Sequence, residues 1–202
     1  MNMVKYLIFA LILLATGTAF AIPRTYQVYV NTSPIAGQSG YLDFQFNPGN
    51  NSLPASASIL NFNAYGGTLG PVNPGDLMGD VTGTLPGPVT FSNRAQVNDY
   101  FQSIKFGSFL SFTVDTPAGS GSSFGFGMFD NLGDPKLTTD PNGFAFILDY
   151  DRDNNITPTF FPASLGGSSV VTASAVPEPS TFALLGLGLA GATVLRKKTR
   201  TQ

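Results

Sequence analysis

The sequence has no cysteine and no histidine among its 202 residues. Without cysteine, no disulfide can stabilise the fold, so a domain of about 150 residues has to rely on a packed core, which its length permits. Without histidine, the chain cannot build a Ser-His-Asp triad, use an imidazole as a general base, or form a zinc site with histidine or cysteine ligands. These absences exclude the hydrolase and zinc sites that depend on those residues.

Charged residues are also scarce, at 11% of the chain. Of the ten Lys and Arg residues, one lies near the N-terminus and four lie at positions 196–200. The remaining five stand against eleven Asp residues between positions 22 and 175, which gives this central part a net charge of about −6. An acidic body gains nothing from counterion release or surface attraction, which argues against nucleic acid and anionic lipid as partners.

The central part contains no glutamate, because the only one is Glu178. A glycoside hydrolase needs two carboxyl groups that face each other, and the sequence pattern marks no such pair among the Asp residues. Serine is abundant, but no Ser-x-x-Lys pattern offers a nucleophile that works without histidine. We therefore expect a protein that is not an enzyme.

The first 21 residues have the pattern of a secretory signal peptide. Lys5 supplies the positive n-region, positions 6–15 are apolar, and Ala19 and Ala21 form an A-x-A cleavage site. The pattern predicts export, with a mature chain that begins at Ile22.

At the other end, an apolar run at positions 180–195 is followed by a basic cluster at 196–200. Sixteen helical residues span about 24 Å, which is less than the roughly 30 Å hydrocarbon core of a bilayer. The basic cluster resists translocation and stays cytoplasmic, so the body is left on the far side. We expect a single short membrane helix that serves as a transient anchor.

These residues resemble the PEP-CTERM sorting signal of Gram-negative bacteria that make exopolysaccharide. The resemblance rests on Pro177, Glu178 and Pro179, the apolar helix and the basic end, in that order. It implies recognition by an exosortase and removal of the tail near the Pro-Glu-Pro motif. The expected organisation is a signal peptide at 1–21, one domain at 22–173, and a sorting signal at 174–202 that begins with a flexible tether. The alternative is a permanent single-span anchor after a Pro-rich linker.

The body has the period-two alternation of β-strands. Leu42, Phe44 and Phe46 share one face, for example, and Asp43 and Gln45 share the other. The predicted strands are 26–30, 41–46, 57–63, 80–84, 89–92, 103–115 with a break near Gly107, 123–130, 143–150, 156–161 and 169–173. A helical turn is expected at 93–101. Short strands separated by Gly, Pro, Asn and Asp predict an all-β fold, an antiparallel β-sandwich of jelly-roll-like or Ig-like type, with a β-barrel as the alternative.

The aromatic residues are expected to fill the core, with Phe in place of the missing Trp. A sugar-stacking platform would need several rings on the polar faces, where the pattern places mainly Tyr29, Tyr41 and Tyr150. The body, from Tyr26 to Phe161, also resembles an uncharacterised family of exported PEP-CTERM proteins, through runs such as 41–49, 79–83 and 140–143. That resemblance implies one continuous domain and no particular chemistry.

The densest acidic cluster is Asp149, Asp151 and Asp153, whose alternation matches the first three ligand positions of a calcium loop. The rest of an EF-hand is missing, because Asn154 stands where glycine is required and Phe160 where a bidentate Glu is required. A looser calcium site, with Asp130 or Asp134 as further ligands, and a solvated hairpin loop both remain open.

We therefore expect a non-enzymatic protein, exported to the cell surface or extracellular matrix of a Gram-negative bacterium. Its role would be structural or adhesive in biofilm or exopolysaccharide. The alternatives are a calcium-dependent carbohydrate-binding module and, with less support, an extracellular hydrolase. Expected partners are an exosortase, exopolysaccharide and, transiently through 180–195, the membrane. No cofactor other than calcium is expected.

Overall fold

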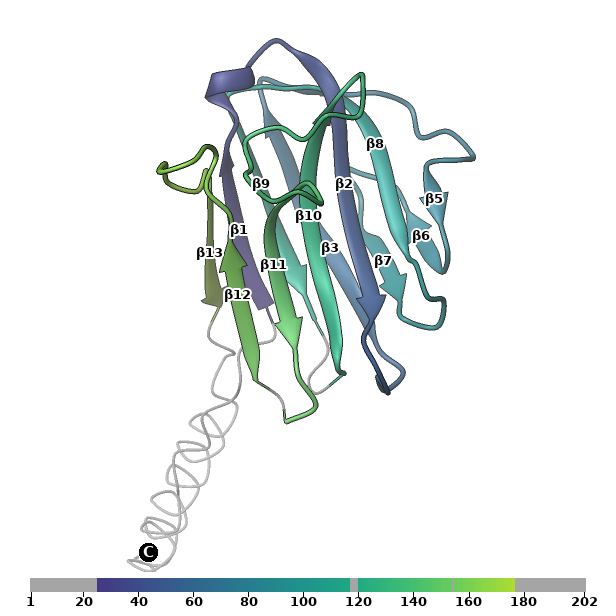
Figure 1. Ribbon diagram of the computed structural model, residues 1–202. Coiled ribbons are helices and arrows are strands. Elements are labelled where there is room, and N and C mark those ends of the chain that lie inside the picture. Colours follow the sequence, from purple (N-terminus) through teal and green to yellow (C-terminus); the bar gives the residue numbers. More distant parts are fainter. Residues whose placement is uncertain (1–24, 117–119, 154, 177–202) are drawn as a thin grey trace, which may run out of the picture.

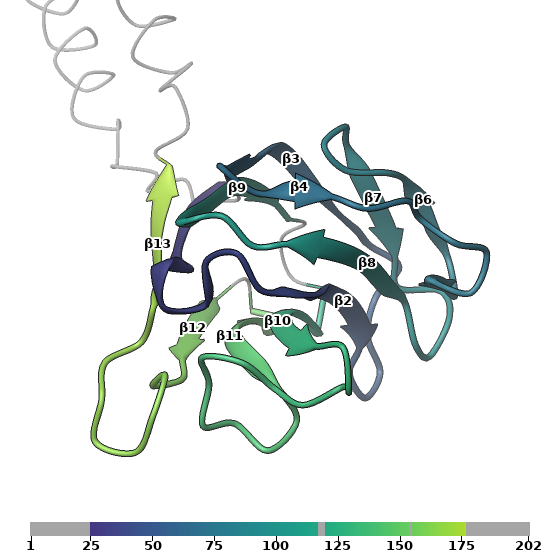
Figure 2. The same cartoon turned by 90° about the horizontal axis from the view of Figure 1, so that it is seen from above.

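The computed structural model describes residues 25–116, 120–153 and 155–176. They form two antiparallel sheets that face each other and do not close into a barrel, so the sandwich prediction is confirmed and the barrel alternative is wrong (Figure 1, Figure 2). The predicted signal peptide and the predicted membrane helix at 180–195 lie outside the described residues. Within the described ranges, no helix is long and apolar enough to span a bilayer.

The first sheet, sheet A, has the strand order β13-β1-β9-β3-β7-β6. Its strands are β1 (Thr25–Asn31), β3 (Ser56–Tyr65), β6 (Val81–Gly83), β7 (Val89–Ser92), β9 (Phe109–Asp115) and β13 (Val171–Val176). The first and the last of the described strands are neighbours in this sheet, because Thr25 pairs with Val176 and Val30 pairs with Val171.

The second sheet, sheet B, has the order β12-β11-β10-β2-β8-β4, and β5 also pairs with β8. Its strands are β2 (Ser39–Pro48), β4 (Thr68–Leu69), β5 (Leu77–Met78), β8 (Asp99–Lys105), β10 (Ser122–Asp130), β11 (Phe144–Tyr150) and β12 (Ile156–Phe160). A short 3-10 helix, η1 (Ser33–Ile35), connects β1 to β2 across the top of the sandwich in Figure 1.

The core between the sheets is dominated by phenylalanine, as predicted. The ring of Phe44 in sheet B meets Phe112 in sheet A edge-on, with centroids 5.2 Å apart and planes at 85°, and it lies 4.9 Å from Phe126. Edge-to-face and tilted ring pairs of this kind add to the ~1.5–3 kcal/mol that burial of each side chain contributes. Packed rings can therefore stabilise this sandwich without tryptophan or disulfides.

Three predictions about local structure were wrong in whole or in part. The segment 93–101 is not helical. Its last residues belong to β8, where Tyr100 alternates with its neighbours and points into the core. The break near Gly107 is real, but it separates β8 in sheet B from β9 in sheet A and is not a bend within one strand. The expected tether begins too early, because β13 continues to Val176.

Candidate functional site

The outward face of sheet B carries side chains that the alternation of β2 directs away from the core. Asp43 pairs in register with Phe101 on β8 and with Gly127 on β10. One step along, Tyr41 pairs with Ser103 on β8 and with Phe129 on β10. Residues that are directly opposite on neighbouring strands point to the same face of a sheet. Aromatic, acidic and small residues from three strands are thus gathered on this face.

The three aromatic residues, Tyr41, Phe101 and Phe129, form what we call the aromatic cluster. The rings of Tyr41 and Phe101 are stacked, with centroids 4.7 Å apart and planes at 15°. Phe129 lies 6.0 Å from Phe101. All three side chains are half-buried. Phe129 lies close to the backbone of Gly127 and Gly143, where an added Cβ would collide with its ring.

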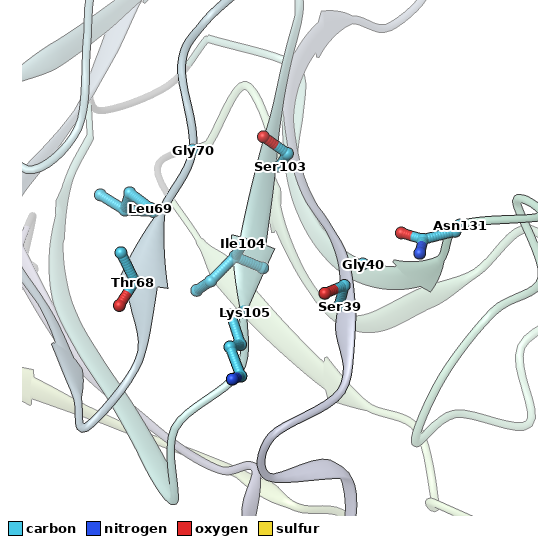
Figure 3. A pocket seen from close by; sticks show the side chains of 9 residues that line it. All are labelled: Ser39, Gly40, Thr68, Leu69, Gly70, Ser103, Ile104, Lys105 and Asn131. Atoms are coloured by element: carbon cyan, nitrogen blue, oxygen red, sulfur yellow. The ribbon is translucent and has the colours of Figure 1, made fainter.

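An open groove of about 400 Å³ lies beside the first residues of β2 (Figure 3). It is lined by residues from β2, β4 and β8 and by the loop after β10: Ser39, Gly40, Thr68, Leu69, Gly70, Ser103, Ile104, Lys105 and Asn131. Hydroxyl groups, one amide and one ammonium group supply its polar atoms. It adjoins the aromatic cluster, because Ser103 pairs with Tyr41 and Gly40 is the residue before Tyr41.

A pair of carboxyl groups, Asp43 and Asp99, lies on the same face and was not predicted. Asp43 has only 4% of its surface exposed. Its carboxyl group is hydrogen-bonded to that of Asp99, and Nε2 of Gln45 donates to its Oδ2 at 2.9 Å. Apart from the hydrogen bond that the two share, Oδ1 of each has no partner among the described residues.

Burial, followed by the hydrogen bond and the negative charge of Asp99, raises the pKa of Asp43 to about 8. Burial also raises the pKa of Asp99. Two adjacent carboxyl groups in a desolvated site favour a state that keeps one proton. At neutral pH the protonated carboxyl group of Asp43 can therefore donate a hydrogen bond to the carboxylate of Asp99.

The predicted calcium ligands lie at the hairpin between β11 and β12. Asp151 closes that hairpin, because its Oδ1 accepts hydrogen bonds from the backbone N–H groups of Asp153 and Asn155 at 2.9 and 2.8 Å. Asp149 accepts a hydrogen bond from Ser123 at 2.6 Å. No group of three or more acidic side chains within 25–116, 120–153 and 155–176 is arranged to hold a metal ion. The calcium site stays a prediction.

The two further candidate ligands, Asp130 and Asp134, lie elsewhere. Asp130 is the last residue of β10, whereas Ser123, the partner of Asp149, is near its start. The carboxylate of Asp130 forms an ion pair with Lys136 at 2.7 Å, which together with backbone N–H groups lowers its pKa to about 2. These residues therefore cannot complete a site with Asp149.

The prediction of which aromatic rings face outward was partly wrong. Tyr150 has only 2% of its surface exposed and belongs to the core. Phe144 was expected inside, but an irregularity in the pairing of β10 with β11 places it opposite Gly127, on the outward face. Its ring packs over Gly125, where a Cβ would lie 2.5 Å from a ring carbon. A pattern of strict alternation cannot reveal such a bulge.

The first residues of β2, which line the groove, and the C-terminal end of β13 lie at opposite ends of the sandwich (Figure 1). β1 begins beside Val176, and its last residue, Asn31, donates to the carbonyl of Val170. From there the chain passes through η1 to Gln38, whose carbonyl accepts the N–H of Phe106 beside the groove. Six steps along β1 at about 3.3 Å each separate the two ends by roughly 20 Å.

A family model of the PEP-CTERM protein-sorting motif matches residues 175–198. No curated protein and no solved structure matches the chain. The matched segment contains Pro177, Glu178 and Pro179, which the sequence singled out as the sorting motif, and all three lie outside the described residues. The chain is an exported protein that carries a C-terminal sorting signal. More specifically, the signal is the PEP-CTERM sorting motif, which marks the chain as a substrate of an exosortase.

Proposed function

We propose that the exported body is a non-enzymatic structural or adhesive protein of the cell surface or extracellular matrix, and that it binds exopolysaccharide on the outward face of sheet B. The observation that supports this most directly is the position of the aromatic cluster beside the polar groove. Sugar rings present apolar C–H faces, which pack on aromatic rings, and hydroxyl groups, which exchange hydrogen bonds with Ser, Thr, Asn and Lys side chains. The two features together match both chemistries.

The orientation of the molecule supports the same proposal. The sorting signal begins at the end of β13, and the groove lies at the other end of the sandwich. A body held at the membrane by its tail would therefore direct the groove away from the bilayer, towards surrounding polymer. The acidic pair supports no catalytic role in this proposal, because the near-complete burial of Asp43 leaves a glycosidic bond no access to its carboxyl group.

The proposal is tested by measuring, with calorimetry or co-sedimentation, whether residues 22–176 bind the exopolysaccharide of the bacterium that produces the protein. Tyr41→Ala removes a stacked ring beside the groove and is expected to weaken binding about tenfold or more, equivalent to roughly 1.4 kcal/mol. Lys105→Ala, within the groove, should also weaken binding. Tyr29→Ala is the matched control, because Tyr29 is an exposed tyrosine stacked on Phe109 at 5.6 Å on sheet A. Absence of polysaccharide binding, or equal losses in Tyr29→Ala and Tyr41→Ala, would contradict the proposal.

A further inference from the structure

Strand β13 is an exposed sheet edge without the usual protection. Exposed edges are normally kept from pairing by short length, charge or proline. At the other edges, β4 and β5 have two residues each, β6 has three, and β12 has Pro158 at its centre. β13 has six residues, none charged and none proline. Among the described edge strands, β13 is therefore the long one that has neither charge nor proline to prevent pairing with another strand.

The sorting motif begins inside this edge strand. The matched segment starts at Ala175, which is paired with Tyr26 on β1, and Val176 is paired with Thr25. Folding therefore places the residues that lead into Pro177 in an extended conformation at the edge of sheet A. The chain immediately upstream of the Pro-Glu-Pro motif is part of the body and not of a separate linker.

The pairing also indicates which backbone groups of β13 are free. The N–H of Asn31 donates to the carbonyl of Val170. In an antiparallel pair, hydrogen-bonded and non-hydrogen-bonded positions alternate, so Thr172, Ser174 and Val176 direct their N–H and C=O groups towards β1. Those of Val171, Ala173 and Ala175 are directed towards the unpaired edge, where the N–H of Val171 donates to Oγ of Ser169 at 3.0 Å.

We propose that the exosortase docks on this unpaired edge as an added strand, and that β13 remains paired with β1 while it does so. Enzymes and domains that bind extended peptides commonly pair with the backbone in this way. The free groups of Ala173 and Ala175 lie directly before the motif that the exosortase recognises, so the edge is continuous with an interface the protein must form. Detaching β13 would instead break its whole ladder with β1 and expose Val171, which is 3% exposed in the sheet.

Processing of the full-length protein in cells, with and without the exosortase, tests both parts of the proposal. In the first variant, Gln27→Cys with Ser174→Cys, a disulfide ties β13 to β1 at residues that are directly opposite in register. The chain has no other cysteine, and the exported body is in an oxidising compartment. We expect this variant to be processed at the rate of the two single-cysteine controls. Accumulation of the disulfide-linked form unprocessed would overturn the proposal, because it would mean that β13 has to detach.

In the second variant, Ala173→Pro removes one free N–H and blocks the edge while leaving the hydrogen bonds to β1 in place. We expect it to reduce processing at least tenfold, while Ala173→Val, which keeps the N–H, is processed normally. A thermal melt of the purified variants checks their folding, and if Ala173→Pro does not fold, the disulfide-linked variant still decides whether β13 stays paired with β1. Normal processing of a folded Ala173→Pro variant would overturn the proposal. If that variant also abolished a dimer of the wild-type body in sedimentation, the edge would belong to a second copy of the chain instead.

Discussion

At the scale of single residues, the unusual feature is a buried acid on the outward face of a sheet. Alternation correctly placed Asp43 on the outward face of the sheet and Phe44 on the core face, but it could not indicate that Asp43 would be buried. Burial arises from neighbours on other strands, such as Phe101, which lie far away in the sequence. The partner, Asp99, was hidden for the same reason, because its segment was interpreted as a helical turn. Where alternation is regular, a single sequence shows the direction of a side chain, but it does not show what covers it.

The carboxyl pair makes the stability of the body depend on pH. The pKa of Asp43 is about 3.8 in the unfolded chain and about 8 in the folded protein. The folded state therefore binds more protons between these values, and its stability falls as the pH rises from about 4 to about 8. We expect a fall of roughly 2–5 kcal/mol from this pair. Urea denaturation of residues 22–176 at a series of pH values measures it.

Asp43→Asn should remove most of this dependence. An amide at position 43 can still accept from Gln45 and can donate to Asp99 at every pH. The variant is expected to be more stable than the wild type at pH 8 and close to it at pH 4. Asp134→Asn, at an exposed loop position, is the control and should keep the wild-type slope. A slope that is unchanged in Asp43→Asn would mean that other groups set the pH dependence.

At the scale of the strands, sequence predicted well where alternation is regular and poorly where it is interrupted. The strand at 89–92 matches β7, and the strand at 123–130 differs from β10 by one residue. The two-residue strands β4 and β5 were missed because two residues carry no periodicity. The end of β13 was missed because Ala and Ser are typical of linkers, although here pairing with β1 orders them.

The last residues of β13 are expected to stabilise the sandwich. A fragment that ends at Ala173 leaves Thr25, Tyr26 and Gln27 of β1 without partners on that side. Each backbone hydrogen bond contributes about 0.5–1.5 kcal/mol, so this fragment should be less stable than residues 22–176 by at least ~1 kcal/mol. Thermal or urea unfolding of the two fragments makes the comparison. Equal stabilities would show that positions 174–176 do not pair with β1 in solution.

At the scale of the whole molecule, sequence predicted a Phe-filled sandwich and its sorting signal, but not the groove. The groove combines β2, β4 and β8 with a loop after β10, and its polar residues form no motif in the sequence. The calcium hypothesis, in contrast, came from local spacing alone. The structure gives Asp151 a different role, since its carboxylate holds the hairpin closed.

A calcium titration separates these two roles. Asp151→Ala should lower the melting temperature of residues 22–176 with or without calcium, because the hairpin loses the hydrogen bonds that its carboxylate accepts. If calcium also binds, millimolar calcium should raise the melting temperature of the wild type, and Asp153→Asn should abolish the rise. A wild type that does not respond to calcium would contradict the calcium hypothesis. A melting temperature of Asp151→Ala equal to that of the wild type would contradict the role in the hairpin.

The antiparallel pairing of β13 with β1 has a mechanical consequence. β13 runs from the end of the sandwich that carries the groove to the other end, where the strand stops at Val176. A force that pulls on the C-terminal end of β13, while the groove end is held, acts along the strand. The hydrogen bonds between β13 and β1 are then loaded together in shear, and they do not break one after another. Such a geometry resists traction along the axis of the molecule.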